Sequence, residues 1–308
     1  MKRGLALLAL LLAATAPAMA QETAGGSQES GDWNVASELN LTLTQNAYSE
    51  NWSGSESGAA SWTLNSNSLA ESQLTPSLHS GTTLKLAFGQ THSQDPATNE
   101  WKRPVKSTDL VDLESVLKLT RGWVVDPFVA GRLETQFLDE SDPSNRRTLN
   151  PLVLTESAGI ARTLIEEEKR ELTMRIGGAL KQHIDRDAST GTDDEIETVT
   201  TSDAGLEFVS EFRTSLADDR IGLYSKLTAY NALYSSEDDE AAGDDWKSAD
   251  VNWENTFTAN VTNYLMVNLY VQMLYDREVD DAVMFKETLS LGFTFQPVSY
   301  THLTLPTN

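Results

Sequence analysis

The sequence predicts an all-β protein, an antiparallel up-and-down transmembrane β-barrel of about 12 strands. Three observations predict this fold class. Apolar and polar residues alternate with a period of two along most of the chain, and long connections alternate with short ones. The alternating segments also exceed the roughly 9–11 residues that a tilted strand needs to cross a membrane. The mean hydropathy of −0.36 excludes a polytopic helical membrane protein.

Residues 1–20 have the features of a secretory signal peptide. Two basic residues precede the apolar run Leu5–Ala14, and Ala18-Met19-Ala20 is a small-x-small cleavage site. The apolar run is about ten residues long, whereas a spanning helix needs roughly 20. We therefore expect export, followed by a flexible Gly/Ser/Glu-rich leader over 21–31 and a barrel domain over 32–297.

Charge and composition exclude several classes of function. The 308 residues contain 46 acidic and 23 basic side chains, which gives a net charge of −23. Phosphate backbones would repel such a chain, so we expect no nucleic-acid partner. The absence of cysteine excludes disulfides, thiolate zinc sites and cysteine nucleophiles. The expected partners are outer-membrane lipid and the barrel-assembly machinery during biogenesis, and no cofactor is expected.

The strand predictions rest on which residues share a face. In the first segment, Leu39, Leu41 and Leu43 alternate with polar residues, as they would on the two faces of a pleated strand. No segment after the signal peptide has a convincing helical period. The clear strands are predicted over 33–45, 109–120, 127–138, 172–184, 206–213, 251–261, 265–276 and 289–296, and weaker ones over 59–70, 82–91, 152–165 and 221–234.

The connections alternate in length, which is typical of an outer-membrane barrel with short periplasmic turns and long external loops. The least regular connection is 72–80. The tryptophans near strand ends, Trp33, Trp123, Trp246 and Trp253, fit an interfacial aromatic girdle. The alternative fold is a soluble β-sandwich, but its strands average nearer 5–6 residues. We expect both termini in the periplasm and the long loops, including 50–57 and 236–248, outside.

The inward face carries charges of both signs. One interpretation is a charged pore lining, and the other is a salt-bridge network that fills a narrow lumen. We favour the network or a narrow channel, because about 12 strands lie between small filled barrels and the wide 16–18-stranded porins. The predicted lumen charges are Asp112, Glu114, Lys118, Arg132, Glu134, Arg175, Lys181, Glu207, Glu211, Arg213, Lys226 and Glu254.

Two features of the loop end suggest other chemistry. The loop 236–248 contains clustered carboxylates, which suit weak calcium binding but lack the spacing of a dedicated calcium loop. His183, Asp185 and Asp187 would suit the base and orienter of a rim hydrolase, yet no serine lies at a diagnostic spacing. We expect no enzymatic activity and assign no catalytic residue. The calcium candidates are Asp238, Asp239, Asp244 and Asp245.

Several short motifs, in this order, resemble a bacterial outer-membrane barrel family catalogued as a domain of unknown function, the one numbered three-zero-seven-eight. The resemblance implies location and architecture and brings no known activity. One departure is Ser55, where the family tends to carry glycine. The motifs are Asn51-Trp52-Ser-Gly54 in the first loop, then Leu86-Ala-Phe88-Gly89, Lys106-Ser-Thr-Asp109-Leu110, Glu134-Thr-Gln-Phe137, Tyr275-Asp276, Lys286-Glu287 and Leu291-Gly292.

The last residues differ from the rest of the chain. Val298–Asn308 resembles a translated sequencing adapter, and Pro297 stands where the alternation places an outward residue. Proline cannot donate to a strand ladder. We therefore expect 298–308 to be a non-native tail and the native strand to end on an aromatic residue at or just beyond position 297.

The sequence thus predicts an integral outer-membrane barrel with either a structural role or the role of a narrow solute channel. Two alternatives remain open: an outer-membrane enzyme with a rim active site, and an acidic-loop barrel that binds calcium or mediates adhesion.

Overall fold

The structure of the protein is a computed structural model. It describes residues 31–46, 57–95, 97–98, 100–141, 146–188, 196–217, 220–236, 245–262 and 265–295. Several predictions lie outside these residues, namely the signal peptide 1–20, most of the leader 21–31, the tail 298–308, the motif residues Asn51, Trp52 and Gly54, and the calcium candidates Asp238, Asp239 and Asp244.

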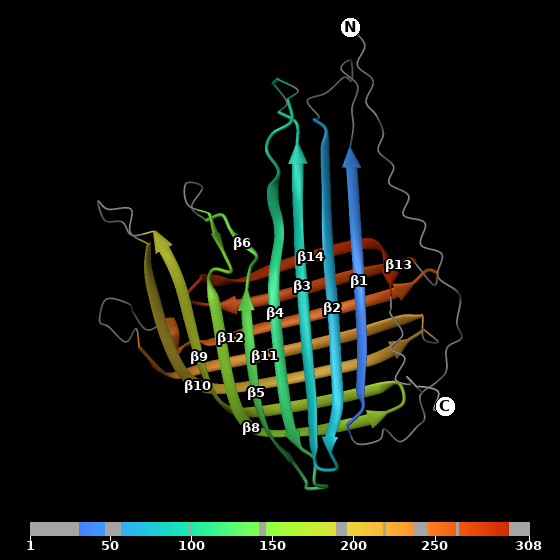
Figure 1. Ribbon diagram of the computed structural model, residues 1–308, viewed down its shortest axis with the longest axis vertical. Coiled ribbons are helices and arrows are strands. Elements are labelled where there is room, and N and C mark those ends of the chain that lie inside the picture. The colour runs from blue at the N-terminus through green and yellow to red at the C-terminus, as the bar shows by residue number, and fades with distance from the viewer. Residues whose placement is uncertain are drawn as a thin grey trace, which may run out of the picture.

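Twelve antiparallel strands form a closed barrel, which confirms the predicted fold class (Figure 1). Each barrel strand pairs with the next one along the chain. β1 closes the barrel against β14 through Leu39–Phe295, Asn40–Thr294 and Leu41–Phe293. The barrel strands are β1 (Trp33–Asn46), β2 (Ala59–Thr75), β3 (Leu78–Ser93), β4 (Val105–Leu119), β5 (Asp126–Thr135), β8 (Leu152–Glu167), β9 (Arg170–Ala188), β10 (Ile196–Leu216), β11 (Ile221–Ser235), β12 (Ala249–Asn260), β13 (Leu265–Asp276) and β14 (Asp280–Phe295).

Three small elements lie outside the barrel wall sheet. β6 (Leu138–Asp139) and β7 (Arg147–Thr148) pair with each other in the connection between β5 and β8. A single 3-10 turn, η1 (Asp245–Lys247), precedes β12. Within the described segments, no helix is long and apolar enough to cross a membrane.

The two ends of the barrel differ in the length of their connections. One end has the turns 76–77, 120–125, 168–169, 217–220 and 261–264, and the other has the connections 47–58, 94–104, 136–151, 189–195, 236–248 and 277–279. The irregular connection 72–80 is a tight turn, because β2 and β3 extend further than their alternation predicts. The connection between β13 and β14 is also short, so the last connection at the long-loop end is a tight turn. The strands reach 21 residues in β10, longer than predicted.

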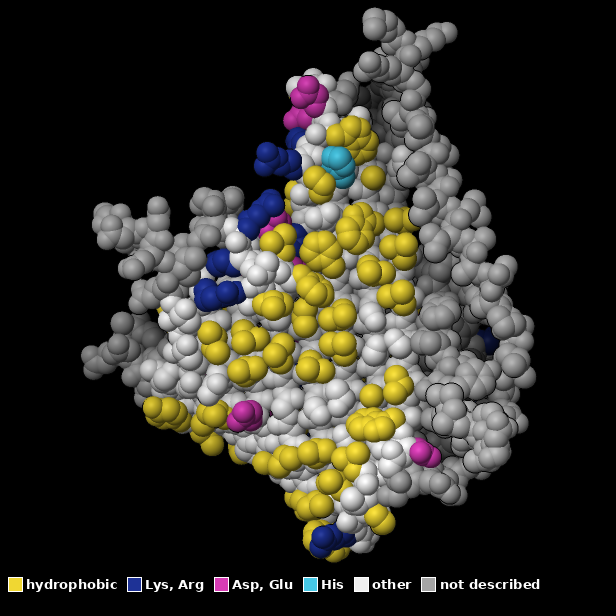
Figure 2. Space-filling model, viewed as in Figure 1, with side chains coloured by type: hydrophobic (Ala, Val, Ile, Leu, Met, Phe, Trp, Pro, Cys, Tyr) yellow, Lys and Arg dark blue, Asp and Glu magenta, His cyan; other side chains and the backbone are white. Residues whose placement is uncertain are grey.

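The outer wall of the barrel is apolar, as the alternation predicts. Leu39, Ile176, Leu206 and Leu289 are 43%, 52%, 51% and 69% exposed, although a soluble protein would bury such side chains. Figure 2 shows apolar side chains spread across the wall that faces the viewer, with most charged groups toward the ends. Because no other layer among the described residues covers this surface, the wall fits contact with lipid hydrocarbon.

Carboxylates also occur on this outward face, and Glu156 and Glu287 are two of them. Glu156 pairs with Gly131 and Leu180 of the flanking strands, and it therefore shares their outward face. Glu287 pairs with Val271 on the same outward parity. The outward face is therefore not apolar at every position. The period-two pattern assigns residues to a face but does not require every residue on that face to be apolar.

The backbones of β8 and β9 approach closely at a pair of inward-facing glycines. A Cβ atom on Gly177 would lie 2.3 Å from the carbonyl oxygen of Ala158, and one on Gly159 would lie 2.1 Å from that of Ile176. These distances are far below van der Waals contact, and both neighbours are backbone atoms that cannot rotate away. The adjacent Gly178 is different, because the nearest atom to its Cβ position would be the oxygen of Gly205 at 4.0 Å.

We expect Gly177→Ala to weaken the barrel and Gly178→Ala to be tolerated. The first change forces two strands apart, whereas the second adds a methyl group in ordinary contact. The fraction of protein that keeps the mobility of a folded barrel on an unheated gel would measure this difference. Equal folded fractions for the two variants would contradict the close approach of β8 and β9.

Candidate functional site: the charged lumen

The charged side chains of the inward face gather at two carboxylates of β4. Asp112 and Glu114 share a face because they are two residues apart on one strand. Opposite them, β5 presents Glu134 beside Asp112 and Arg132 beside Glu114. Asp112 is therefore opposite a like charge and Glu114 is opposite a charge of the other sign. The remaining cations belong to strands on other sides of the barrel.

Glu114 forms the first of two ion-pair clusters. Its two carboxylate oxygens accept separate bonds, one from Arg175 of β9 at 2.5 Å and one from Lys226 of β11. Glu211 of β10 lies 3.5 Å from the same guanidinium and 3.9 Å from the same ammonium group. The Arg175 and Lys226 side chains are each 6% exposed, so these charges depend on protein partners rather than on bulk water.

Asp112 forms the second cluster. Arg132 donates two hydrogen bonds to its carboxylate, both at 3.0 Å, in the bidentate geometry that favours arginine. The same guanidinium lies 2.9 Å from Glu134. Lys85 of β3 is 4.0 Å from Asp112 and 2.8 Å from Glu254 of β12.

Two of these ion pairs cross the lumen rather than following its wall. In the barrel order, β4 lies almost opposite β11, and β3 lies almost opposite β12. The pairs Glu114–Lys226 and Lys85–Glu254 therefore join facing walls. Side chains that meet across a barrel leave no wide passage at that level, which favours the filled-lumen interpretation over the open pore.

The other predicted lumen charges lie at the edges of the two clusters or apart from them. Arg213 lies near the short-turn end, half exposed, 3.7 Å from Glu171 and 3.9 Å from Glu211. Lys181 lies toward the long-loop end, 3.1 Å from Asp250. Within the described residues, the structure gives no ion pair to Lys118 or Glu207. Glu207 lines a small cavity between the clusters, beside Glu114, Arg132 and Lys226.

Three charged participants were not predicted from the sequence, namely Lys85, Asp250 and Glu171. Each has the inward parity of its strand. Lys85 stands between Leu84 and Leu86, a signal that could have identified it even though its strand was a weak prediction. Asp250 and Glu171 lie at or beyond the ends that the alternation gave to their strands, where parity was not extended.

A separate polar cluster fastens the connection between β5 and β8 to the rim. The side chain of Asn150 donates to Asp139 at 2.8 Å and to Asp185 at 2.7 Å, and it accepts from the backbone of Arg186 at 2.8 Å. Arg147 lies 2.7 Å from Asp139. Burial acts to raise the pKa of Asp139, but hydrogen bonds and the Arg147 guanidinium outweigh it and hold that pKa at about 2.

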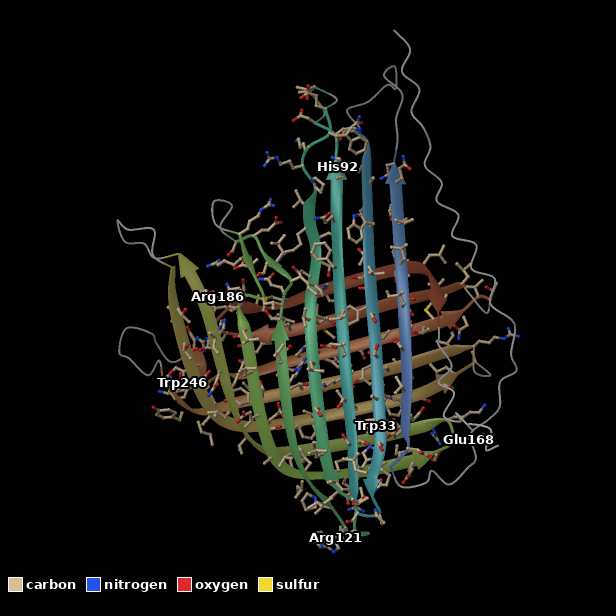
Figure 3. All side chains as sticks on the ribbon, viewed as in Figure 1. Trp33, His92, Arg121, Glu168, Arg186 and Trp246 are labelled. Atoms are coloured by element: carbon tan, nitrogen blue, oxygen red, sulfur yellow. The ribbon has the colours of Figure 1, made fainter. Side chains whose placement is uncertain are left out.

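This polar cluster includes Asp185, one of the rim residues that were considered for catalysis. Asp185 is engaged by Asn150, and His183 is exposed on the neighbouring strand position. The side chain of Asp187 lies outside the described part of the chain. Figure 3 places Arg186 and His92 at this end of the barrel, and Arg121 and Glu168 at the opposite end (Figure 3).

The connection before β12 also departs from expectation. Asp245, a calcium candidate, lies 3.0 Å from Arg277. Among the described histidines and acidic residues, no three lie close enough together to hold a metal ion. Trp33, Trp123 and Trp253 are exposed as the girdle prediction requires, but Trp246 is buried beside Ala179 and Tyr230. The prediction was wrong for Trp246 because η1 turns this side chain into the mouth of the barrel.

Comparisons with known proteins reveal distant structural similarity only. No family model and no curated protein matches the chain. An outer membrane channel from Pseudomonas putida F1 has a TM-score of 0.39 and 14% identity, over 90% of this chain and 99% of that one. The translocator domain of the autotransporter NalP from Neisseria meningitidis has a TM-score of 0.36 and 8% identity, over 87% and 89%. These scores are too low to transfer a function.

Proposed function

We propose that this protein is an integral outer-membrane barrel whose lumen is closed to all but the smallest solutes by cross-lumen ion pairs. The observation that carries the proposal is the contact between facing walls, from Lys85 to Glu254 and from Lys226 to Glu114. The apolar outer wall supports the membrane location. The role is structural or that of a narrow channel, and the ion pairs rather than a reaction account for the buried charges.

Conductance in planar bilayers tests this proposal. The unmodified protein should give no large stepwise conductance, because the ion pairs occupy the lumen. The double variant Lys85→Ser and Lys226→Ser should conduct more, since it removes the two side chains that reach across. Lys118→Ser is the matched control, because it removes a lysine that joins neither cluster. Large steady conductance in the unmodified protein would overturn the closed lumen.

The lengths of the connections support one orientation of the barrel. Long connections outside and tight turns in the periplasm are the arrangement of outer-membrane barrels. We expect protease added to intact cells to cut within 47–58 and 236–248. Cutting confined to the turns Thr262–Asn263 and Ala217–Asp219 would mean that the barrel has the opposite orientation.

A further inference from the structure

Two aromatic side chains at the long-loop mouth of the barrel have buried donors without partners. Tyr230 of β11 is 7% exposed and Trp246 of η1 is 9% exposed. Across the described part of the chain, neither the Tyr230 hydroxyl nor the Trp246 indole nitrogen has a hydrogen-bond partner. The two rings belong to one buried cluster with Ala179 and Ala232. Buried donors are normally satisfied, so this pair calls for an acceptor.

The same mouth carries an excess of carboxylates. Tyr230 faces Glu207 on one neighbouring strand and Asp250 on the other. Asp250 in turn interacts electrostatically with Asp203 and Asp276.

The adjoining turn, residues 277–279 between β13 and β14, lies next to the same excess of negative charge. Arg277 of this turn lies 3.0 Å from Asp245 of η1, which holds the turn against the mouth. Burial, together with the carboxylates of Asp203, Asp276 and Asp250, raises the pKa of Glu278 to about 7. The mouth therefore favours added positive charge.

The position of the Lys181 side chain shows that this mouth can hold a primary amine. Its ammonium group lies 3.1 Å from Asp250 and 5.4 Å from the centre of the Tyr230 ring. A primary amine between a carboxylate and an aromatic face combines an ion pair with a cation–π contact. One lysine leaves the remaining carboxylates in excess. A metal ion fits less well than an organic amine, because the described acidic residues do not converge into a set of metal ligands.

We infer that the long-loop mouth binds a small solute that carries a primary amine next to hydroxyl or carbonyl oxygens. The amine would lie among Asp203, Asp250 and Asp276, and the oxygens would accept from Tyr230 and Trp246. This inference rests on the proposed function, in which ion pairs beneath the mouth close the lumen. The mouth is then a surface that ends at these ion pairs and is not the entrance of a wide pore.

Calorimetric titration of the folded full-length protein tests the site with glucosamine, which has both an amine and hydroxyl oxygens. N-acetylglucosamine is the matched ligand, because acetylation removes the positive charge and keeps the sugar. We expect glucosamine to bind and the acetylated sugar to bind at least tenfold more weakly. No binding of glucosamine, or equal binding of the two sugars, would overturn the inference.

Three variants locate the site. Asp250→Asn and Tyr230→Phe should each weaken glucosamine binding several-fold, the first through the charge and the second through the hydroxyl alone. Tyr224→Phe, on the same face of β11 but deeper, near Arg213, should leave binding unchanged. Gel mobility of the unheated variants verifies folding. Unchanged binding in a folded Tyr230→Phe variant would refute the assignment. Conductance without sugar tests the closed lumen separately, so the two proposals can fail independently.

Discussion

Replacing Glu114 by glutamine should destabilise the folded barrel by about 3 kcal/mol, the lower part of the range for breaking a buried ion pair. The carboxylate neutralises both Arg175 and Lys226, and glutamine would leave these two cations with Glu211, at 3.5 and 3.9 Å, as their remaining ion-pair partner. The lower part of the range applies because Glu114 itself is 14% exposed. Denaturant unfolding in lipid vesicles would measure the loss.

Two further variants separate an ion-pair effect from a packing effect. Adding Lys226→Met to Glu114→Gln removes the orphaned ammonium group and should restore part of the lost stability. Glu134→Gln should cost much less, because Glu134 is 34% exposed and Arg132 keeps both hydrogen bonds to Asp112. If Glu114→Gln and Glu134→Gln were equally destabilising, Glu114 would not be the centre of the cluster.

The period-two pattern predicts the wall of this barrel well because pleating alone decides the face on which a side chain lies. The four weak segments are all strands in the structure, and the inward parity of Asp112, Glu114 and Arg132 is as predicted. The local sequence is therefore sufficient to assign most side chains of a strand to one face.

The partners of the lumen charges could not be predicted in the same way. Which strands face each other depends on the tilt and stagger of the strands as well as on their number, and alternation encodes neither tilt nor stagger. The sequence therefore predicts most of the residues that line the lumen. It does not predict that Glu114 pairs with Lys226 or that Lys85 pairs with Glu254.

The prediction that Trp246 belongs to the aromatic girdle was wrong for a related reason. Its position near a strand end suits a girdle, but the conformation of the preceding connection decides whether the ring points to lipid or into the mouth. The inference of a binding site at the mouth depends on the buried position of Trp246 in η1, which the alternation does not predict.

The apolar wall leads to the second large effect. Leu269 of β13 lies on the outward face, between Phe257 of β12 and Leu289 of β14. Arginine near the midplane of the lipid-facing surface costs roughly 2–4 kcal/mol, because the guanidinium must leave water. Leu269→Arg should therefore reduce the amount of folded barrel in the outer membrane.

The adjacent position provides the control. Asn268 points into the lumen, where its side chain lies 3.5 Å from the carboxylate of Glu38. An arginine at position 268 would keep water or a carboxylate within reach, so Asn268→Arg should assemble far better than Leu269→Arg. The amounts of folded protein in membrane fractions would compare the two variants. Because a shift of one residue in strand register exchanges the two faces, greater damage from Asn268→Arg would mean that β13 is inverted relative to the lipid.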